Sequence, residues 1–241
     1  MIGKKTKIAL CLSGEPRSSM FCFPYIYESF IDLGDKYEID IYIHSWKGFR
    51  TLNLYKPTKH LIEPFISEEI TSKNYNILKN KDINITRFNI NNIFLMFYSI
   101  QKCFNLIQKP YDIYIRSRFD LIFTSKLNLP FYIDNILNNF YDLLIPEYKY
   151  TFTHDYFPNT NIPCYSDQIA IGNYSAIKYY SNFYSNIIKY ITQLKEYDPH
   201  KILGMYLDNS KLKIKKDIAD YRLVRKSGVI TNYSNFNFFD E

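Results

Sequence analysis

Short apolar runs that end in polar residues predict the first two strands of a parallel sheet. Residues 7–13 (KIALCLS) have the pattern of a buried strand that ends at Gly14. Residues 38–45 (EIDIYIHS) alternate and are rich in β-branched side chains, which predicts a second strand. Residues 18–33 predict a helix between them, with Pro24 restricting where it can begin. Because strand, helix and strand in succession need a crossover connection, the two strands are expected to be parallel.

The remainder of the chain continues this alternation of strand and helix patterns. Further strands are expected at residues 111–116, 141–145 and 169–172. Helices are expected from a cap at Asn91 or Asn92 to Gln108, from a cap at Ser175 to Lys195, and from Pro199 to Leu207. A basic strand-like segment follows at residues 211–225, and the Asn-rich tail from Thr231 is expected to be loosely ordered. Since no repeat or linker divides the chain, we predict a single α/β domain over residues 1–241, with a mostly parallel central sheet flanked by helices.

One segment of the chain has a regular apolar pattern, and another long segment has none. Along the predicted helix from Ser175, apolar residues recur at intervals of three and four, which indicates a face packed on the core rather than a cofactor site. These residues are Ile177, Tyr180, Tyr184, Ile187, Ile191 and Leu194. The span between Glu147 and Asp167, by contrast, has no clean periodicity. Loops of this length in compact domains are often functional lids, with simple disorder as the alternative.

Charge and composition narrow the classes of partner. The formal net charge of +6 and the pI near 8.9 fall below what a dedicated nucleic-acid binder shows, so no nucleic acid is expected as a partner. The excess suits an anionic substrate such as a nucleotide diphosphate, or peripheral contact with an anionic membrane surface; a solvated lysine-rich surface explains it equally well. The four cysteines lack metal-binding spacing, and neither a signal peptide nor a transmembrane segment is visible, so a cytoplasmic location is expected.

Polar clusters follow three of the predicted strands, where an open parallel sheet binds its ligands. After the first strand come Ser13, Gly14 and Arg17, in which the glycine permits a tight turn and the arginine can bind a phosphate bidentately. After the second come His44 and Trp46, which are able to hold a base or a sugar ring. For the first cluster the alternative is an ordinary turn, which needs glycine in any case. For His44 and Trp46 the alternative is a partly buried structural pair.

The third cluster follows the strand at residues 111–116 directly. Alternation along an extended chain places Arg116, Arg118 and Asp120 on one side. Two guanidinium groups and a carboxylate are costly to bury together without an anionic ligand or a metal. We therefore predict that these three side chains line a ligand pocket, with a surface ladder of salt bridges as the alternative.

Together these segments resemble the WavE-like glycosyltransferases of surface polysaccharide and lipopolysaccharide synthesis, which have relatives in large DNA viruses. The resemblance rests on CLSGEPR, IYIHSW, YDIYIRSRFDLIF, YSDQIAIGNYSAI and the segment PHKILGMYLDNSKLKIKKDIADYRLVR, in order over roughly residues 6–226. It implies a GT-A type fold. The nucleotide-sugar-binding half would span about residues 6–125 and the acceptor-side half about 126–226, followed by a tail at 227–241.

The resemblance also implies roles for individual residues. The family's metal-binding D-x-D motif corresponds to Arg118-Phe119-Asp120, so an arginine replaces the first carboxylate. Arg118 can then neutralise the diphosphate directly, while Asp120 can bind Mn²⁺, Mg²⁺ or a ribose hydroxyl. This departure puts dependence on a divalent cation in doubt.

On the acceptor side, Asp167 and Gln168 match the family's carboxylate motif. Asp167 is the predicted catalytic base; in a retaining enzyme it would orient the acceptor or face the anomeric carbon, and an ordinary helix or turn cap is the alternative. Three further candidates for the acceptor site or lid are His154, His200 and Arg222.

The sequence thus predicts an enzyme that transfers a sugar from a nucleoside-diphosphate donor to a saccharide acceptor in surface glycan synthesis. A non-catalytic carbohydrate-binding module with the same fold is the main alternative, since Arg118 departs from the motif. Another nucleotide-dependent transferase, such as a Rossmann methyltransferase or a nucleotidyltransferase, is disfavoured because no G-x-G-x-x-G follows the first strand and no acidic residue stands suitably after the second.

Overall fold

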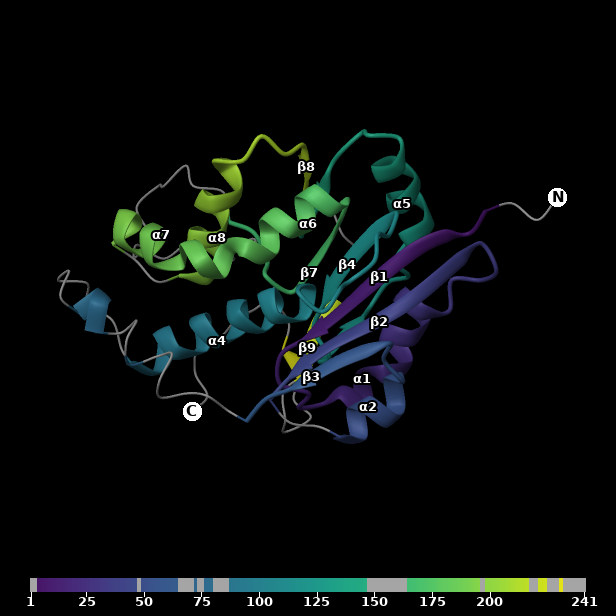
Figure 1. The fold of residues 1–241 in the computed structure, drawn as a ribbon, viewed down its shortest axis with the longest axis horizontal. Helices are drawn as coiled ribbons and strands as arrows, with labels where there is room; N and C mark the ends of the chain where they lie inside the picture. The colour runs from purple at the N-terminus through teal and green to yellow at the C-terminus, as the bar shows by residue number, and fades with distance from the viewer. Residues whose placement is uncertain are drawn as a thin grey trace.

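The central feature of the chain is a mixed sheet with helices on both faces, seen in a computed structural model (Figure 1). The structure describes residues 4–46, 49–64, 72, 76–79, 87–146, 164–195, 198–216, 221–224 and 230–231. The predicted α/β class with a mostly parallel, helix-flanked sheet is confirmed. The division into a donor half and an acceptor half stays a prediction.

Within the described residues the main sheet has seven strands in the order β3-β2-β1-β4-β7-β6-β8. The strands are β1 (Thr6–Ser13), β2 (Tyr37–Ser45), β3 (Lys59–Ile62), β4 (Ile113–Ser117), β6 (Leu143–Leu144), β7 (Ile169–Gly172) and β8 (Ile214–Lys215). The pairs β1–β2, β2–β3, β1–β4 and β6–β8 are parallel, whereas β7 runs antiparallel to both of its neighbours. The strands predicted at 111–116 and 141–145 are therefore present but shorter.

The reversed direction of β7 decides which residues share an edge of the sheet. Ser13 lies opposite His44, and the neighbouring Leu12 lies opposite Ser117, so the carboxyl ends of β1, β2 and β4 are level. Ser117 in turn lies opposite Ile169, the first residue of β7. The chain that enters β7 thus arrives at the same edge where the parallel strands end.

Helices bury two separate cores, one on each face of the sheet (Figure 1). On one face lie α1 (Ser19–Ile26) with the π-helical turn Tyr27–Ile31, α2 (Phe49–Tyr55) and α5 (Leu129–Leu137). On the other lie α4 (Arg87–Phe104), α6 (Tyr174–Ser181), α7 (Ile187–Leu194) and α8 (Pro199–Asp208). Alternate residues of β1 divide between the two cores, since Ile8 and Leu10 face one and Ala9 and Cys11 the other.

Several predicted helix boundaries are wrong. The helix expected to begin at Asn91 or Asn92 begins at Arg87, and Pro24, expected to restrict where the first helix begins, lies inside α1. The helix expected from Ser175 to Lys195 is broken at a 3₁₀ segment, Asn182–Asn186. Its cap is Asn173, whose Oδ1 accepts a hydrogen bond from the Ala176 amide at 2.9 Å, while Ser175 lies inside the first turn. The apolar stripe along these helices is nonetheless core, as predicted.

A small second sheet joins the middle of the chain to its C-terminal part. Its order is β10-β9-β5, with β5 at Leu121–Phe123, β9 at Tyr221–Val224 and β10 at Ile230–Thr231. The basic segment predicted as one strand at 211–225 therefore forms β8 in the main sheet and β9 here. Because the Val224 amide donates to the Asp120 carbonyl at 2.9 Å, β9 lies directly beside the third polar cluster.

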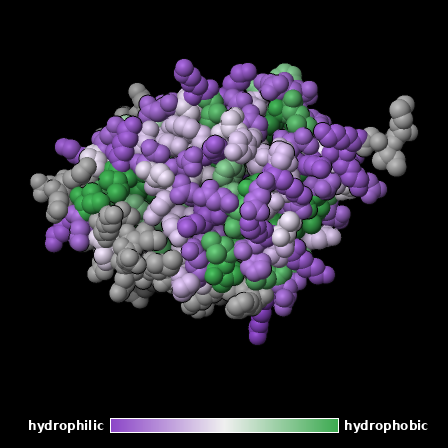
Figure 2. Space-filling model, viewed as in Figure 1, coloured by the Kyte–Doolittle hydropathy of each residue, from purple (hydrophilic) through white to green (hydrophobic). Residues whose placement is uncertain are grey.

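The surface drawn in Figure 2 is mostly hydrophilic, with hydrophobic residues in separate groups. The large exposed apolar side chains include Met20, Phe21, Tyr25 and Tyr27 at α1, and Phe131, Leu137 and Phe140 at or near α5. Within the described parts of the chain, no helix has both the length and the apolar character needed to cross a membrane.

Candidate functional site

The turn after β1 has the form that the sequence predicts. Gly14 has a φ of +120°, a conformation that L side chains rarely adopt, and its amide donates to the His44 carbonyl at 3.2 Å. Ser13 is buried at the end of the strand. Arg17 is half-exposed beyond the turn, where its Nε donates to Glu15 at 2.9 Å. The turn therefore presents a partly solvated guanidinium at the edge of the sheet.

Arg118 and Asp120 form a bidentate ion pair just beyond β4. The guanidinium donates through Nε to Oδ1 at 2.7 Å and through Nη2 to Oδ2 at 2.8 Å. The Asp120 side chain is 1% exposed, whereas that of Arg118 is 20% exposed. Burial on its own would raise the pKa of Asp120, but the charge and hydrogen bonds of Arg118 and the charge of Arg17 outweigh it and lower that pKa. Asp120 is thus held ionised by two arginines.

Arg116 does not join this pair, which corrects the prediction that all three side chains lie together. It is buried, and its Nη1 donates to the backbone carbonyl of Asp167. The chain leaves the β4 ladder after Ser117, so the strict alternation assumed from the sequence ends before Arg118 and Asp120. Arg116 instead links the end of β4 to the chain that enters β7.

Asp167 lies in a turn that two hydrogen bonds fix through its backbone. Its carbonyl accepts from Arg116 and from the Tyr180 hydroxyl, the latter at 3.0 Å. It caps no helix among the described elements, because α6 is capped by Asn173 and α8 by Asp198. The alternative reading of Asp167 as a helix cap is therefore wrong. Its side chain is 5% exposed, and Oδ1 lies 3.7 Å from Nδ1 of His200.

His200 and the small second sheet surround this turn. His200 is in the first turn of α8, and its Nδ1 lies 3.0 Å from the carbonyl oxygen of Tyr165. Tyr221 of β9 donates its hydroxyl to Oγ of Ser166 at 2.7 Å. His200, predicted only as a candidate for the acceptor site or lid, therefore lies beside Asp167, although the two belong to segments about thirty residues apart.

His44 and Trp46 form a buried structural cluster in this conformation. The His44 side chain has no exposure, and its two ring nitrogens lie 2.7 Å from Ser99 and 2.7 Å from Glu63. Burial lowers the pKa of His44 further than Glu63 raises it, so the ring is neutral at pH 7. Trp46 is 5% exposed and stacks on Tyr98 at 5.6 Å. Neither ring presents a free face to a base or a sugar.

Two further candidates lie elsewhere. Arg222 is half-buried in β9 opposite Ile122, and its side chain makes no hydrogen bond or ion pair with any described residue. His154 and most of the predicted lid, residues 147–163, lie outside the described residues.

Sequence reasoning missed several residues that build the site. Tyr180 and Tyr221 fix the Asp167 turn, yet Tyr180 was predicted only as part of the apolar core face and Tyr221 was not singled out. Glu63 and Ser99 occupy the nitrogens of His44. Since these contacts join distant segments, no local pattern could have predicted them.

Buried polar atoms without partners collect at this edge of the sheet. Among the described residues, six buried side-chain atoms lack a hydrogen-bond partner, and four of them belong to predicted site residues: Ser13 Oγ, Arg116 Nε, Asp167 Oδ2 and Gln168 Oε1. Such groups cost about 1–3 kcal/mol each when left unpaired, so native proteins rarely keep them without water or a ligand. This concentration makes the edge a candidate site for a polar ligand.

The described residues do not fit a divalent cation at Asp120. Both of its carboxylate oxygens are bound by Arg118. In the same set of residues, no three His, Cys, Asp or Glu side chains are grouped so as to hold a metal ion. The positive charge at this edge comes from arginines instead.

Comparison with known proteins gives a similarity of fold. No family model matches the chain, and no curated protein sequence matches it either. Among solved structures, the chain is similar to mouse xyloside xylosyltransferase 1 in its apo form, with a TM-score of 0.44 and 15% identity over 88% of this chain and 84% of that one. A similarity at this level carries no argument about activity, and the WavE-like resemblance stays a prediction.

Proposed function

We propose that the chain is a glycosyltransferase that takes its sugar from a nucleoside diphosphate and passes it to a saccharide acceptor. The observation that carries this proposal is the edge where β1 and β4 end and β7 begins. It brings together a half-exposed arginine, a second arginine held by a buried carboxylate, and a separate aspartate with an unpartnered oxygen. Stabilisation of the leaving diphosphate needs positive charge, which the arginines carry. Removal of the proton from the acceptor hydroxyl needs a base, which the aspartate can supply.

On the donor side, Arg17 and Arg118 supply the positive charge. A departing nucleoside diphosphate develops negative charge, which guanidinium groups stabilise through charge-assisted, often bidentate hydrogen bonds. The pair with Asp120 holds the Arg118 guanidinium in place, so little reorganisation is needed when the charge develops. With arginines in this role, the donor site works without the D-x-D metal arrangement that the resemblance implies.

On the acceptor side, Asp167 takes the proton. An acceptor hydroxyl oxygen attacks the anomeric carbon, the bond from that carbon to the diphosphate oxygen breaks, and its electron pair leaves with the diphosphate. The hydroxyl proton passes to Oδ2 of Asp167, which has no hydrogen bond among the described residues. The other oxygen, Oδ1, lies 3.7 Å from Nδ1 of His200. In a retaining enzyme the same carboxylate would orient the acceptor instead.

We place the enzyme in surface glycan synthesis, with the WavE-like family as its relatives. The exposed Met20 and Phe21 of α1, which begins at the donor edge, would allow peripheral contact with a membrane that carries the acceptor.

One observation favours a second candidate, a carbohydrate-binding module without turnover. An enzyme that requires a metal at the D-x-D position cannot use Asp120 while Arg118 binds both of its oxygens.

A thermal-shift screen with UDP, GDP, CDP and S-adenosylmethionine separates these functions. We expect one nucleoside diphosphate to raise the melting temperature and the matching nucleotide sugar to be slowly hydrolysed. Stabilisation by S-adenosylmethionine alone would indicate a methyltransferase, and stabilisation by no nucleotide would favour the binding module.

A further inference from the structure

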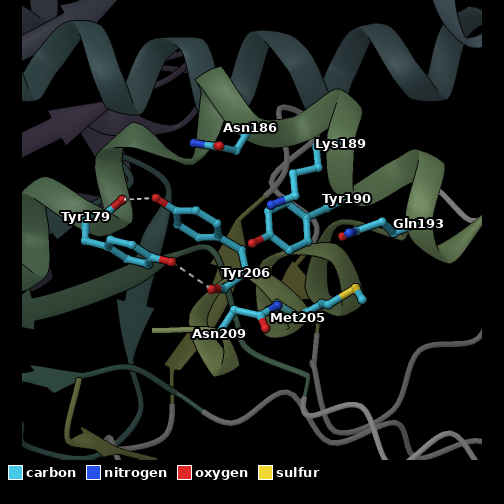
Figure 3. Close-up of a pocket in the computed structure, with 8 residues that line it drawn as sticks. All are labelled: Tyr179, Asn186, Lys189, Tyr190, Gln193, Met205, Tyr206 and Asn209. Carbon is cyan, nitrogen blue, oxygen red and sulfur yellow. Dashed lines mark hydrogen bonds between the residues drawn. The ribbon is translucent and has the colours of Figure 1, made fainter. Parts of the chain in front are cut away.

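A polar pocket lies in the helical layer, away from the donor edge (Figure 3). Its volume is about 460 Å³, within the roughly 300–1,000 Å³ of small-molecule sites. Tyr179, Tyr190 and Tyr206 form its floor, and Lys189 and Gln193 stand on its rim. We call this site the tyrosine pocket.

The floor is rigid because its aromatic rings fix one another. Tyr179 and Tyr206 stack with centroids 4.4 Å apart and planes 12° from parallel. Each hydroxyl donates to the other residue's backbone carbonyl, at 3.2 Å from Tyr179 and 2.8 Å from Tyr206. Tyr190 meets Tyr206 edge-on at 5.4 Å. The pocket therefore needs no rearrangement before it binds a ligand.

Its unused hydrogen-bonding groups point to a ligand rich in hydroxyls. Tyr190 is only 4% exposed, yet its hydroxyl has no hydrogen bond among the described residues and lies in the pocket (Figure 3). The Gln193 amide is likewise unpaired within that set. The Asn186 and Asn209 amides each donate one proton to their own helices, to the Asn182 and Met205 carbonyls, and keep their oxygens as acceptors.

Other ligand classes fit less well. A phosphate group needs concentrated positive charge, whereas the lining has one cation, Lys189, whose ammonium lies 5.3 Å from the Tyr190 ring centre. An apolar ligand would leave the rim amides and the hydroxyl without water or partners, which is costly. A sugar ring offers C–H faces to tyrosine rings and hydroxyls to amides at once.

We propose that the tyrosine pocket binds sugar units of a glycan, apart from the site of transfer. It is separate because α8 carries both His200 and Tyr206: six residues advance about 9 Å along a helix and turn about 240° round its axis. Binding there would keep a long acceptor close and raise its effective concentration at Asp167. The proposal that sugars bind here rests on the pocket alone. Only the role of the pocket in holding an acceptor for transfer rests on the proposed function.

The test is saturation-transfer NMR and titration of the full chain with cellohexaose, maltohexaose and chitohexaose, with no nucleotide present. We expect at least one to bind. Gln193→Ala and Tyr190→Phe should each weaken that binding about 2- to 10-fold, because each removes a hydrogen bond at the pocket. Gln193 is exposed, so its loss should leave the melting temperature unchanged.

The matched control is Tyr174→Phe, which removes the hydroxyl of a tyrosine 49% exposed on α6 and outside the pocket. This variant should bind like the wild type. Binding of none of the three hexasaccharides, or equal affinity in both pocket variants and the wild type, would overturn the proposal. Hexasaccharide binding without any nucleotide binding would support the sugar-binding pocket and contradict the proposed glycosyltransferase activity.

Discussion

Replacing Asp167 with asparagine separates catalysis from structure at this position. The backbone of Asp167 is fixed by Arg116 and Tyr180 through its carbonyl, which the substitution leaves intact. The side-chain oxygens accept no hydrogen bond from any described residue, and Oδ1 lies 3.7 Å from Nδ1 of His200. Asparagine matches the size of aspartate, so the turn should keep its shape.

The expected magnitudes differ sharply for stability and turnover. The substitution removes no hydrogen bond of the side chain, so the free energy of unfolding should change by about 1 kcal/mol or less. Losing a general base lowers turnover by roughly 10²–10⁴, which is about 3–5 kcal/mol in activation free energy. Donor affinity should stay within about threefold of wild type, because the proposed donor contacts are those of Arg17 and Arg118.

Three measurements on Asp167→Asn decide the point: sugar transfer, nucleotide affinity and melting temperature. The matched control is Asp198→Asn, since Asp198 caps α8 by accepting from the His200 amide at 2.8 Å and asparagine caps equally well. The control should keep its turnover. Near-normal transfer by Asp167→Asn would remove this residue from the mechanism.

Three further outcomes follow from the contacts. Arg118→Ala should lower the free energy of unfolding at pH 7 by about 3 kcal/mol, because it leaves buried Asp120 unpaired. The wild-type pKa of Asp120 lies below 3.8, and the stabilisation from the ion pair is lost as the pH falls through that pKa. Urea unfolding should therefore show that the stability difference between variant and wild type shrinks below pH 4. His44 has a lowered pKa, so wild-type stability should fall as pH drops below about 6.5, and His44→Gln should flatten that slope in thermal melts. Asn173→Ala should cost about 1 kcal/mol of stability and Ser175→Ala less, by chemical denaturation, since Asn173 is the cap; equal costs would contradict the assignment.

The sequence predicted the strands that position the site because their apolar runs are short and end abruptly. β1, β2 and β7 begin within one residue of their expected positions, and the glycine after β1 has the positive φ that its turn needs. Helix ends were harder to predict, and at the start of α6 two polar residues, Asn173 and Ser175, compete for the cap. Asn173 has the extended backbone of a cap, whereas Ser175 lies two residues inside.

Pairwise contacts at the site could be predicted only in part. The ion pair of Arg118 and Asp120 joins residues two apart in sequence, within reach of local reasoning. The role of Arg116 depends on the reversed direction of β7, which brings Asp167 beside the end of β4. The burial of His44 depends on Ser99, which follows it by 55 positions, and such distant partners leave no local signal.

Calorimetric titration of nucleoside diphosphates into the wild type, Arg118→Ala and Asp167→Ala tests the central claim most directly. If the edge of the sheet is a donor site, one nucleoside diphosphate binds the wild type. Arg118→Ala should then weaken it roughly tenfold or more, because a charge-assisted hydrogen bond contributes about 1.5–3 kcal/mol. Asp167→Ala, on the acceptor side, should weaken it much less. Equal losses in the two variants, or no binding of any nucleoside diphosphate to the wild type, would contradict the account.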